Sequence, residues 1–224
     1  MSVEIVVHES REALAAALAA SVAADARAAI ASRGRTLLAA PGGGTPRPFL
    51  QRLAEEALEW PRVGVVATDE RWTPLDDPRS NASMIQAALG GKGVFTPFYA
   101  DGETPEAAAE RLSGAFAAAR FDQVVMGMGA DMHCASLFPG APELAAAMDE
   151  AGPLFSRMTP GDGLEPRVTL TARALVSAGV IRLLITGEEK RAALDAALAE
   201  DDPLLAPVGA VLRRARRAEA HWAA

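Results

Sequence analysis

The sequence predicts an α/β protein with three layers, α/β/α, around an open, mostly parallel, Rossmann-like sheet. The first observation is that short apolar runs alternate with longer Ala-rich amphipathic stretches, the pattern of strands joined by helical right-handed crossovers. The second observation is size, because 224 residues that are 50% hydrophobic can bury a substantial core. We therefore expect residues 1–224 to form a single domain.

The N-terminal part begins with an apolar run at 3–7, which predicts a strand. A helix is expected over 11–32, with Ser10 in the N-cap position. The run 36–40 predicts a second strand. The helix expected next, over 46–58, has a proline near its first turn, where proline is tolerated.

The middle of the chain continues the alternation. The apolar run 63–68 predicts a strand, and 80–89 has a helical pattern. A weaker strand is expected at 94–99, followed by a helix over 105–119. The apolar run 123–126 predicts a further strand, which leads directly into a glycine-rich segment.

The C-terminal part holds the remaining expected elements. These are short strands at 154–158 and 167–171, a strand at 180–186, helices over 188–200 and 208–216, and a strand at 219–222.

Composition excludes several function classes. The single cysteine, Cys134, excludes an intrachain disulfide and a cysteine-based zinc cluster. A net charge of −7 argues against nucleic-acid binding. No apolar run approaches the ~20 residues that a membrane span needs, and residues 1–9 lack the layout of a signal peptide. We expect a cytoplasmic protein with no metal or cofactor and no nucleic-acid or membrane partner.

Four polar clusters lie directly after predicted strands, at 42–45, 69–71, 127–133 and 187–190. Ligands of open parallel sheets bind at the carboxyl ends of the strands. This coincidence predicts that the four clusters contribute to one active site.

Three of the clusters suit a phosphate. The first is a glycine-rich loop before a helix, which exposes backbone N–H groups, although a strand-to-helix turn alone can also require glycine. Arg71 could grip a phosphate, oriented by an acidic neighbour, or belong to a solvated turn. Lys190, one of only two lysines, opposes the dipole of the expected helix unless an anion binds there; the alternative is a solvated lysine beside two glutamates. The loop residues are Gly42, Gly43, Gly44 and Thr45.

The fourth cluster delivers Asp131 and His133 on a glycine-rich loop. Histidine is the natural general base near neutral pH, although a lone histidine is often structural. The sequence has no G-x-S-x-G nucleophile elbow, no H-E-x-x-H and no nucleotide-binding motif. The chemistry that remains is acid–base catalysis on an activated substrate.

Taken together, these segments resemble the 6-phosphogluconolactonases, which are relatives of glucosamine-6-phosphate deaminase. The sequence PGGGTP at 41–46 is similar to the family's S-G-G-S-T-P loop, and DERWTP at 69–74 with Ser80 and Asn81 is similar to D-E-R-x-V-P…S-N. MGMGADMHCASLFPG at 126–140 is similar to L-G-M-G-x-D-G-H-T-A-S-L-F-P-G. Two further segments, which contain Arg167 and Lys190, also match in order along the chain.

The resemblance implies hydrolysis of 6-phosphoglucono-δ-lactone to 6-phosphogluconate, a step of the oxidative pentose phosphate pathway. It implies that His133 deprotonates water and that Asp131 orients the loop or the imidazole. Lactone and phosphate binding would fall to the glycine loop with Asp69, Arg71, Asn81, Arg167 and Lys190. No residue is assigned as the oxyanion donor, and both monomer and homodimer stay open.

The sequence departs from the family at three positions. Met132 stands where the family has glycine, so the backbone beside His133 is not free to adopt a positive φ. Cys134 replaces a threonine, and Asp77 stands where many members have histidine. Two alternatives therefore stay open. A deaminase-like isomerase is disfavoured by the lactonase-like segment 136–139, and a non-catalytic sugar-phosphate sensor is kept open by Met132 and Cys134.

Overall fold

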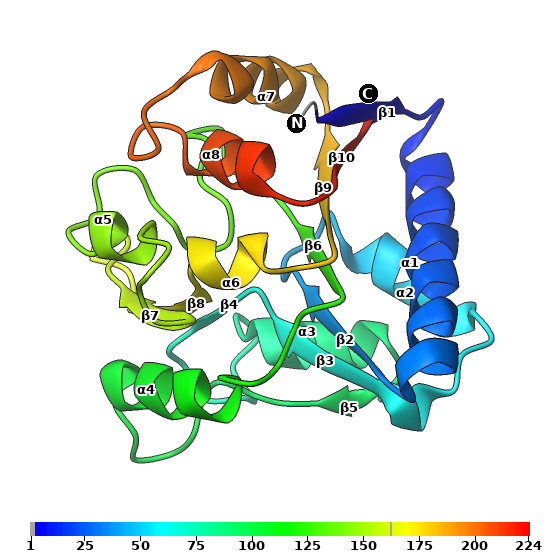
Figure 1. Cartoon of the computed structure of the whole chain (residues 1–224), viewed down its shortest axis with the longest axis horizontal. Coiled ribbons are helices and arrows are strands. Elements are labelled where there is room, and N and C mark those ends of the chain that lie inside the picture. The colour runs from blue at the N-terminus through cyan, green and yellow to red at the C-terminus, as the bar shows by residue number, and fades with distance from the viewer. Residues whose placement is uncertain (1–2, 162) are drawn as a thin grey trace.

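A computed structural model describes residues 3–161 and 163–224 (Figure 1). Within these residues the main sheet has seven strands in the order β1-β10-β9-β6-β2-β3-β5, and every neighbouring pair is parallel. The expected parallel sheet is therefore confirmed. The strands are β1 (Glu4–Val7), β2 (Thr36–Ala40), β3 (Val63–Ala67), β5 (Val94–Phe95), β6 (Gln123–Met126), β9 (Val180–Thr186) and β10 (Ala218–Ala223).

Helices cover both faces of this sheet, which gives the expected three layers. Figure 1 shows the sheet nearly edge-on, with α1 and α2 on one side and α4, α6 and α8 on the other. Every residue of β6 is buried, as the central strands of a parallel sheet covered on both faces require. The helices are α1 (Arg11–Arg33), α2 (Arg47–Glu55), α3 (Asn81–Ala88), α4 (Pro105–Ala115), α5 (Leu144–Ala147), α6 (Ala172–Val176), α7 (Glu188–Ala199) and α8 (Pro207–Arg214).

A second, smaller sheet was not expected. Its three strands, β4 (Asp69–Arg71), β8 (Arg167–Leu170) and β7 (Phe155–Met158), are antiparallel and stand in the order β4-β8-β7. The strands predicted near 154–158 and 167–171 exist, but they pair with each other and with β4 instead of joining the main sheet. The sequence of a short strand does not indicate which other strand it will pair with.

Several elements were predicted to be longer than they are. The strand expected at 94–99 is only two residues, and the helices expected over 46–58 and 105–119 end at Glu55 and Ala115. The short helices α5 and α6 and a 3-10 turn at Trp60–Arg62 were missed. By contrast, α1 has the N-cap that the sequence indicated, because the Ser10 hydroxyl accepts from the Ala13 N–H at 3.0 Å. The helix ends at a left-handed Gly34.

Helix α1 corrects one expectation about the membrane. Its most apolar window of 18 residues has a mean hydropathy of 1.5, so by length and composition α1 alone among the described helices passes as a span. Counting consecutive apolar residues misses this property, because alanines with few charges raise the average. Half of the window is buried inside the structure, with Leu14, Leu18 and Val22 turned to the core. The core helix of a soluble protein has the same composition.

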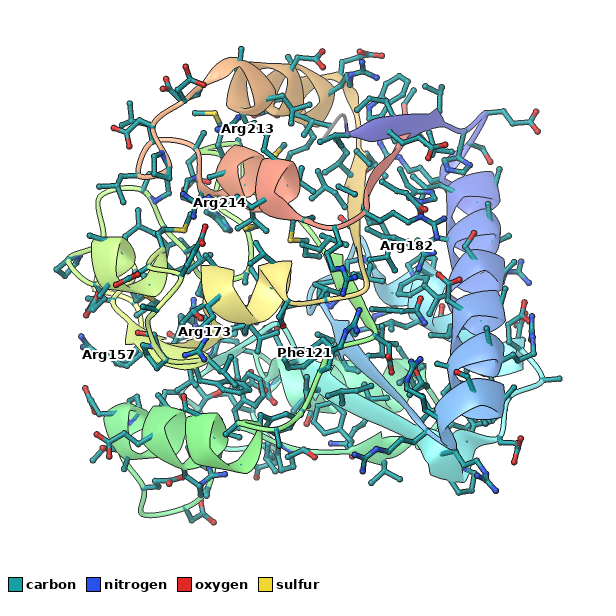
Figure 2. All side chains as sticks on the ribbon, viewed as in Figure 1. Phe121, Arg157, Arg173, Arg182, Arg213 and Arg214 are labelled. Carbon is teal, nitrogen blue, oxygen red and sulfur yellow. The ribbon has the colours of Figure 1, made fainter. Side chains whose placement is uncertain are left out.

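A buried ionic network ties α1 to the sheet. Arg182, in the middle of β9, is 1% exposed and lies between the sheet and α1 (Figure 2). Its guanidinium donates to Glu219 of β10 at 2.7 Å, to the side-chain oxygen of Gln123 in β6 at 2.6 Å, and to Asp25 of α1. Because a buried charge is costly unless it is paired, this network fixes the position of α1 against three strands.

Candidate active site at the carboxyl ends of the strands

The main sheet reverses its strand order between β2 and β6. The chain passes from β2 to β3 on one side of this point and from β6 to β9 on the other. Two of the predicted clusters, 42–45 and 127–133, follow β2 and β6 directly. Open α/β sheets bind ligands in the crevice outside such a switch point.

A pocket of about 240 Å³ occupies this crevice. The structure thus brings the glycine loop and Lys190 together, as the sequence predicted, although they are separated by about 145 residues along the chain. The lining of the pocket comes from the ends of three strands. These residues are Pro41, Gly42, Gly43, Gly44, Thr45 and Pro46 after β2, Gly127 and Met128 after β6, and Leu184, Ile185, Thr186 and Lys190 around the end of β9.

The glycine loop depends on a close approach at its first position. A Cβ on Gly42 would lie 1.9 Å from Oδ1 of Asn81, so only glycine fits between the loop and α3. The amide of Asn81 donates to the backbone oxygen of Asp69 at 2.8 Å. Asn81 therefore links the loop to β4. Gly43, Gly44 and Thr45 are exposed, and helix α2 begins directly afterwards, which leaves N–H groups open to a ligand.

Lys190 lies in the first turn of α7 and reaches across to the β6 loop. Its ammonium donates to the backbone oxygen of Met128 at 2.8 Å, and the side chain is partly buried. Among the described residues no carboxylate lies within ion-pair distance of it. A single carbonyl satisfies only one of the three ammonium donors, so two remain for a ligand in the pocket.

His133 and Asp131, the two residues predicted to be catalytic, contact each other, but neither is among the residues that line the pocket. His133 Nδ1 lies 2.6 Å from Oδ1 of Asp131, and both side chains remain partly accessible. The pair packs against Gly129, where a Cβ would approach both side chains to 2.2 Å. Phe138 covers one side of the imidazole, with the ring centroids 4.9 Å apart. The contact with Asp131 occupies Nδ1 and leaves Nε2 as the nitrogen that can exchange a proton with a ligand.

Met132 adopts a positive φ of 66° despite its side chain. This conformation costs a non-glycine residue roughly 1–2 kcal/mol. The loop is held in it by three contacts: Met132 N–H to the Gly129 oxygen at 3.1 Å, Val208 N–H to the Met132 oxygen at 3.2 Å, and the Met132 side chain against the core. The expected obstacle is therefore overcome, and the loop follows a path of the kind that glycine allows.

Cys134, the second departure, is fully buried. Burial raises the pKa of its thiol, so the group stays protonated and unreactive near neutral pH. Its backbone bridges to Leu137, which closes the turn that carries Ser136. Asp77, the third departure, pairs with Arg79 at 2.9 Å, and this pairing lowers the pKa of the Asp77 carboxyl.

Asp69 acts as a connector and does not line the pocket. Its two carboxylate oxygens accept from the Thr68 hydroxyl at 3.0 Å and from the Ser136 hydroxyl at 2.7 Å. The Ser136 N–H in turn donates to the Thr169 hydroxyl at 3.1 Å. Asp69 therefore joins the glycine loop, through Asn81, to the loop of His133 and to the small sheet.

Arg71 and Arg167 stand directly opposite each other on β4 and β8. Opposed residues of an antiparallel pair share one face, and Asp69 lies on the same face two residues away. Arg167 is 8% exposed and pairs with Glu165 at 2.6 Å, while Arg71 donates to the backbone oxygen of Arg79. The two arginines lie outside the 240 Å³ pocket, on the small sheet that Asp69 connects to it.

Glu70 is the residue that sequence reasoning missed. It was considered only as an acidic neighbour that orients Arg71. Instead, its fully buried carboxylate accepts from the N–H groups of Asn81 and Ala82, both at 2.7 Å, and from the Ser80 hydroxyl at 3.2 Å. It thereby caps the N-terminus of α3. Burial raises the pKa of this carboxyl, against the opposing effect of the backbone hydrogen bonds. The alternation of strand residues was the available signal, since it turns Glu70 away from Asp69 and Arg71.

Comparison with known proteins identifies a family that matches nearly the whole chain. Residues 9–222 match the model of a family described as glucosamine-6-phosphate isomerases/6-phosphogluconolactonase. A 6-phosphogluconolactonase of Rhizobium meliloti is 40% identical over the whole of both chains, and one of Pseudomonas putida is 39% identical over 92% of this chain and 88% of its own.

Solved structures of similar proteins have the same fold as this chain. A 6-phosphogluconolactonase from Shewanella baltica superposes with a TM-score of 0.94 at 29% identity, covering 100% of this chain and 98% of its own. A monomeric glucosamine-6-phosphate deaminase, 17% identical with a TM-score of 0.82 over 98% of this chain and 97% of its own, shares the fold. The chain belongs to the glucosamine-6-phosphate isomerase/6-phosphogluconolactonase family.

Proposed function

We propose that the protein hydrolyses 6-phosphoglucono-δ-lactone to 6-phosphogluconate, in the oxidative pentose phosphate pathway. The observation that carries the proposal is that the glycine loop and Lys190 line one pocket at the switch point of the sheet, while the His133–Asp131 pair lies on the loop whose first residues, Gly127 and Met128, line the same pocket. A phosphate site beside an oriented imidazole suits an ester that carries a phosphate. Relatives named as 6-phosphogluconolactonases, 40% and 39% identical, favour this lactone over a deaminase substrate.

In the proposed reaction, the lactone carbonyl carbon lies near Nε2 of His133. A water molecule attacks this carbon while Nε2 takes one of its protons. Asp131 holds the imidazole through Nδ1 and stabilises the imidazolium that forms. The tetrahedral intermediate then collapses, the bond from C1 to the ring oxygen breaks, and the ring oxygen takes the proton back from Nε2. The product is an open-chain acid, which ionises to release one proton into solution.

The phosphate is assigned to the glycine loop and the nearby cations. Gly42, Gly43, Gly44 and Thr45, which precede α2, line the pocket together with Lys190, so backbone N–H groups and one ammonium are available for the phosphate. Arg71 and Arg167 would add charge from the small sheet, where they share one face. Asp69 and Asn81 position these elements relative to one another.

The positive φ of Met132 also bears on the sensor alternative. That alternative was kept open by Met132 and Cys134, and His133, which lies between them, keeps its contact with Asp131. We propose a single catalytic domain, monomeric or homodimeric, that works in the cytoplasm without metal or cofactor. Among the described residues, no three His, Cys, Asp or Glu side chains are grouped so that they could hold a metal ion.

The direct experiment follows acid release from freshly prepared lactones. Phosphorylated and unphosphorylated gluconolactone are compared, with and without EDTA. We expect enzymatic acid release from the phosphorylated lactone, much slower release from the other, and no effect of EDTA. Equal rates on both lactones would reject the phosphate site. Loss of activity with EDTA, restored by zinc, would reject the metal-free mechanism.

A further inference from the structure

A second pocket, of about 670 Å³, lies at the amino ends of the strands of the main sheet, opposite to the pocket that holds Lys190. Thr36 and Val94 are the first residues of β2 and β5, and Asp122 directly precedes β6, so this pocket faces the amino ends of the strands. No residue lines both this pocket and the one that holds Lys190. Its lining residues are Arg33, Arg35, Thr36, Leu37, Pro61, Arg62, Gly64, Val94, Ala115, Phe116, Ala118, Ala119, Arg120 and Asp122.

The pocket is strongly basic in a protein whose net charge is −7. Four of its lining residues are arginines and one is an aspartate. Arg33 pairs with Asp122, and Arg62 pairs with Glu59 at 2.9 Å and donates to the Gly34 oxygen. These two arginines have the ordinary role of cations near the end of α1.

The other two arginines differ. Within residues 3–161 and 163–224, Arg35 and Arg120 have neither an ion pair nor a side-chain hydrogen bond. Arg35 precedes β2 and Arg120 precedes β6, and these strands are neighbours in the sheet. Both side chains are exposed, and two unpaired guanidinium groups ahead of adjacent strands can together neutralise a phosphate dianion.

An unpartnered polar group lies in the same pocket. Thr36 is 3% exposed, and its hydroxyl has no hydrogen-bond partner within the described part of the chain. A buried polar group left without a partner costs roughly 1–3 kcal/mol, so such groups are uncommon in folded proteins. The oxygen itself has almost no accessible surface, so a ligand in the pocket would satisfy this hydroxyl only after the Thr36 side chain rotates about χ1 to turn the oxygen toward the pocket.

The remaining wall is apolar. Leu37, Phe116 and the side chain of Val94, which is 56% exposed, line it together with prolyl and alanyl groups. Its volume falls within the range of about 300–1,000 Å³ that is typical of pockets for small molecules. A site with this wall suits a molecule with an anionic head and a flat apolar body.

We propose that this pocket binds an organic phosphate of the nucleoside monophosphate class, at a site distinct from the catalytic one. Arg35 and Arg120 hold the phosphate, the apolar wall formed by Leu37, Val94 and Phe116 covers the base, and Thr36 bonds a polar atom of the ligand. The two sites lie at opposite edges of one sheet, so both can be occupied at once.

The test is calorimetric titration with AMP, with adenosine and inorganic phosphate as separate probes. Wild type is compared with Arg35→Ala/Arg120→Ala and with the control Arg52→Ala, which removes an arginine exposed on α2 and outside the pocket. All titrations are repeated in a Lys190→Ala background, which weakens phosphate binding at the catalytic pocket without touching the second site. This readout needs no lactone, so its failure is separate from failure of the proposed activity.

We expect one AMP per chain, with affinity lowered about 10- to 100-fold in the double variant. The affinity should be unchanged in Arg52→Ala and should persist in the Lys190→Ala background. Thr36→Val, which keeps the shape of the side chain and removes its hydroxyl, should weaken AMP binding without unfolding the protein. No AMP binding, or binding that is lost with Lys190→Ala and kept in the double variant, would overturn the proposal. Inorganic phosphate binding as tightly as AMP would overturn the assignment to a nucleoside phosphate.

Discussion

The Nδ1 atom of His133 lies 2.6 Å from Oδ1 of Asp131, two residues earlier on the same loop. Gly129 leaves the space for this contact, because a Cβ there would approach both side chains. The His133 oxygen also accepts from the Gly129 N–H at 2.9 Å, which closes the loop on itself. The imidazole thus contacts a carboxylate through Nδ1 and packs against the ring of Phe138.

Asp131→Ala should lower kcat by about 10²-fold and leave KM nearly unchanged. The variant keeps His133 but removes the contact that orients its ring, and a misplaced catalytic group costs on the order of 10²-fold in rate. Steady-state kinetics on the phosphorylated lactone measure both constants. Asp195→Ala, on the exposed side of α7, is the matched control and should behave as wild type. An unchanged kcat in Asp131→Ala would remove Asp131 from the mechanism.

Met132→Gly and Met132→Val should separate strain from packing at the catalytic loop. Glycine adopts a φ of 66° without steric cost, so Met132→Gly should keep activity. The stability of the folded state should change little, because the loss of side-chain packing offsets the relief of backbone strain. Valine is β-branched and disfavours this region, so Met132→Val should lose both activity and stability, by about 1–2 kcal/mol. Thermal unfolding and kcat are measured together. Full activity in Met132→Val would show that the loop does not depend on this conformation.

Lys190→Ala should raise KM about 10- to 100-fold, because a hydrogen bond to a charged group contributes about 1.5–3 kcal/mol. The chain offers an unusually clean control, since Lys92 is the only other lysine. Lys92 donates to the Ala54 oxygen at 2.7 Å, away from the pocket. Lys92→Ala should therefore leave KM unchanged. Equal effects of the two substitutions on KM would mean that Lys190 contributes only general charge.

Arg71→Ala tests whether the small sheet contributes to binding. Arg71 lies outside the pocket but on the same strand face as Asp69. We expect a higher KM with a smaller change in kcat. The free energy of substrate binding should weaken by ~2–5 kcal/mol if the arginine meets the phosphate in a desolvated contact. An unchanged KM would confine phosphate binding to the glycine loop and Lys190.

Glu219 should produce part of the acid sensitivity of the fold. Its hydrogen bond with His221 and its ion pairs with Arg182 and Arg217 lower its pKa to about 2, against an ordinary value of 4.5. A depressed carboxyl pKa stabilises the folded state above pH 4.5, and this contribution is lost as pH falls from 4.5 toward 2. The shift corresponds to about 3 kcal/mol.

Denaturant unfolding of wild type and Glu219→Gln between pH 7 and 3 measures that contribution. The variant should be less stable at neutral pH, because Arg182 loses a buried partner. The difference between the two proteins should shrink as pH falls below 4.5. A difference that stays constant with pH would show that Glu219 is not the titrating group.

The sequence predicted the alternating strands and the clusters at their carboxyl ends, because both depend on local patterns. The run 180–186 became β9 without change, and the glycine loop and Lys190 met as the strand rule requires. The resemblance to the lactonase family, since confirmed by the family match, added roles that local patterns do not give.

What failed was non-local. Nothing in residues 69–71 indicates that they leave the main sheet and pair with 167–169, and this pairing alone sets Arg71 opposite Arg167. The burial of Glu70 under α3 and of Arg182 under α1 depends on the same tertiary choices. The conformation of Met132 was judged from intrinsic preference, which contacts with Gly129 and Val208 override.

The most direct test of the proposed mechanism is the turnover of His133→Asn beside wild type, on phosphorylated lactone at neutral pH. Asparagine roughly keeps the size and polarity of the side chain but cannot accept the proton of water. The mechanism predicts that wild type hydrolyses the lactone and that kcat falls about 10²- to 10⁴-fold in the variant, with KM much less affected. A variant within a few-fold of wild type, or a wild type that binds phosphogluconate and never hydrolyses the lactone, would contradict it.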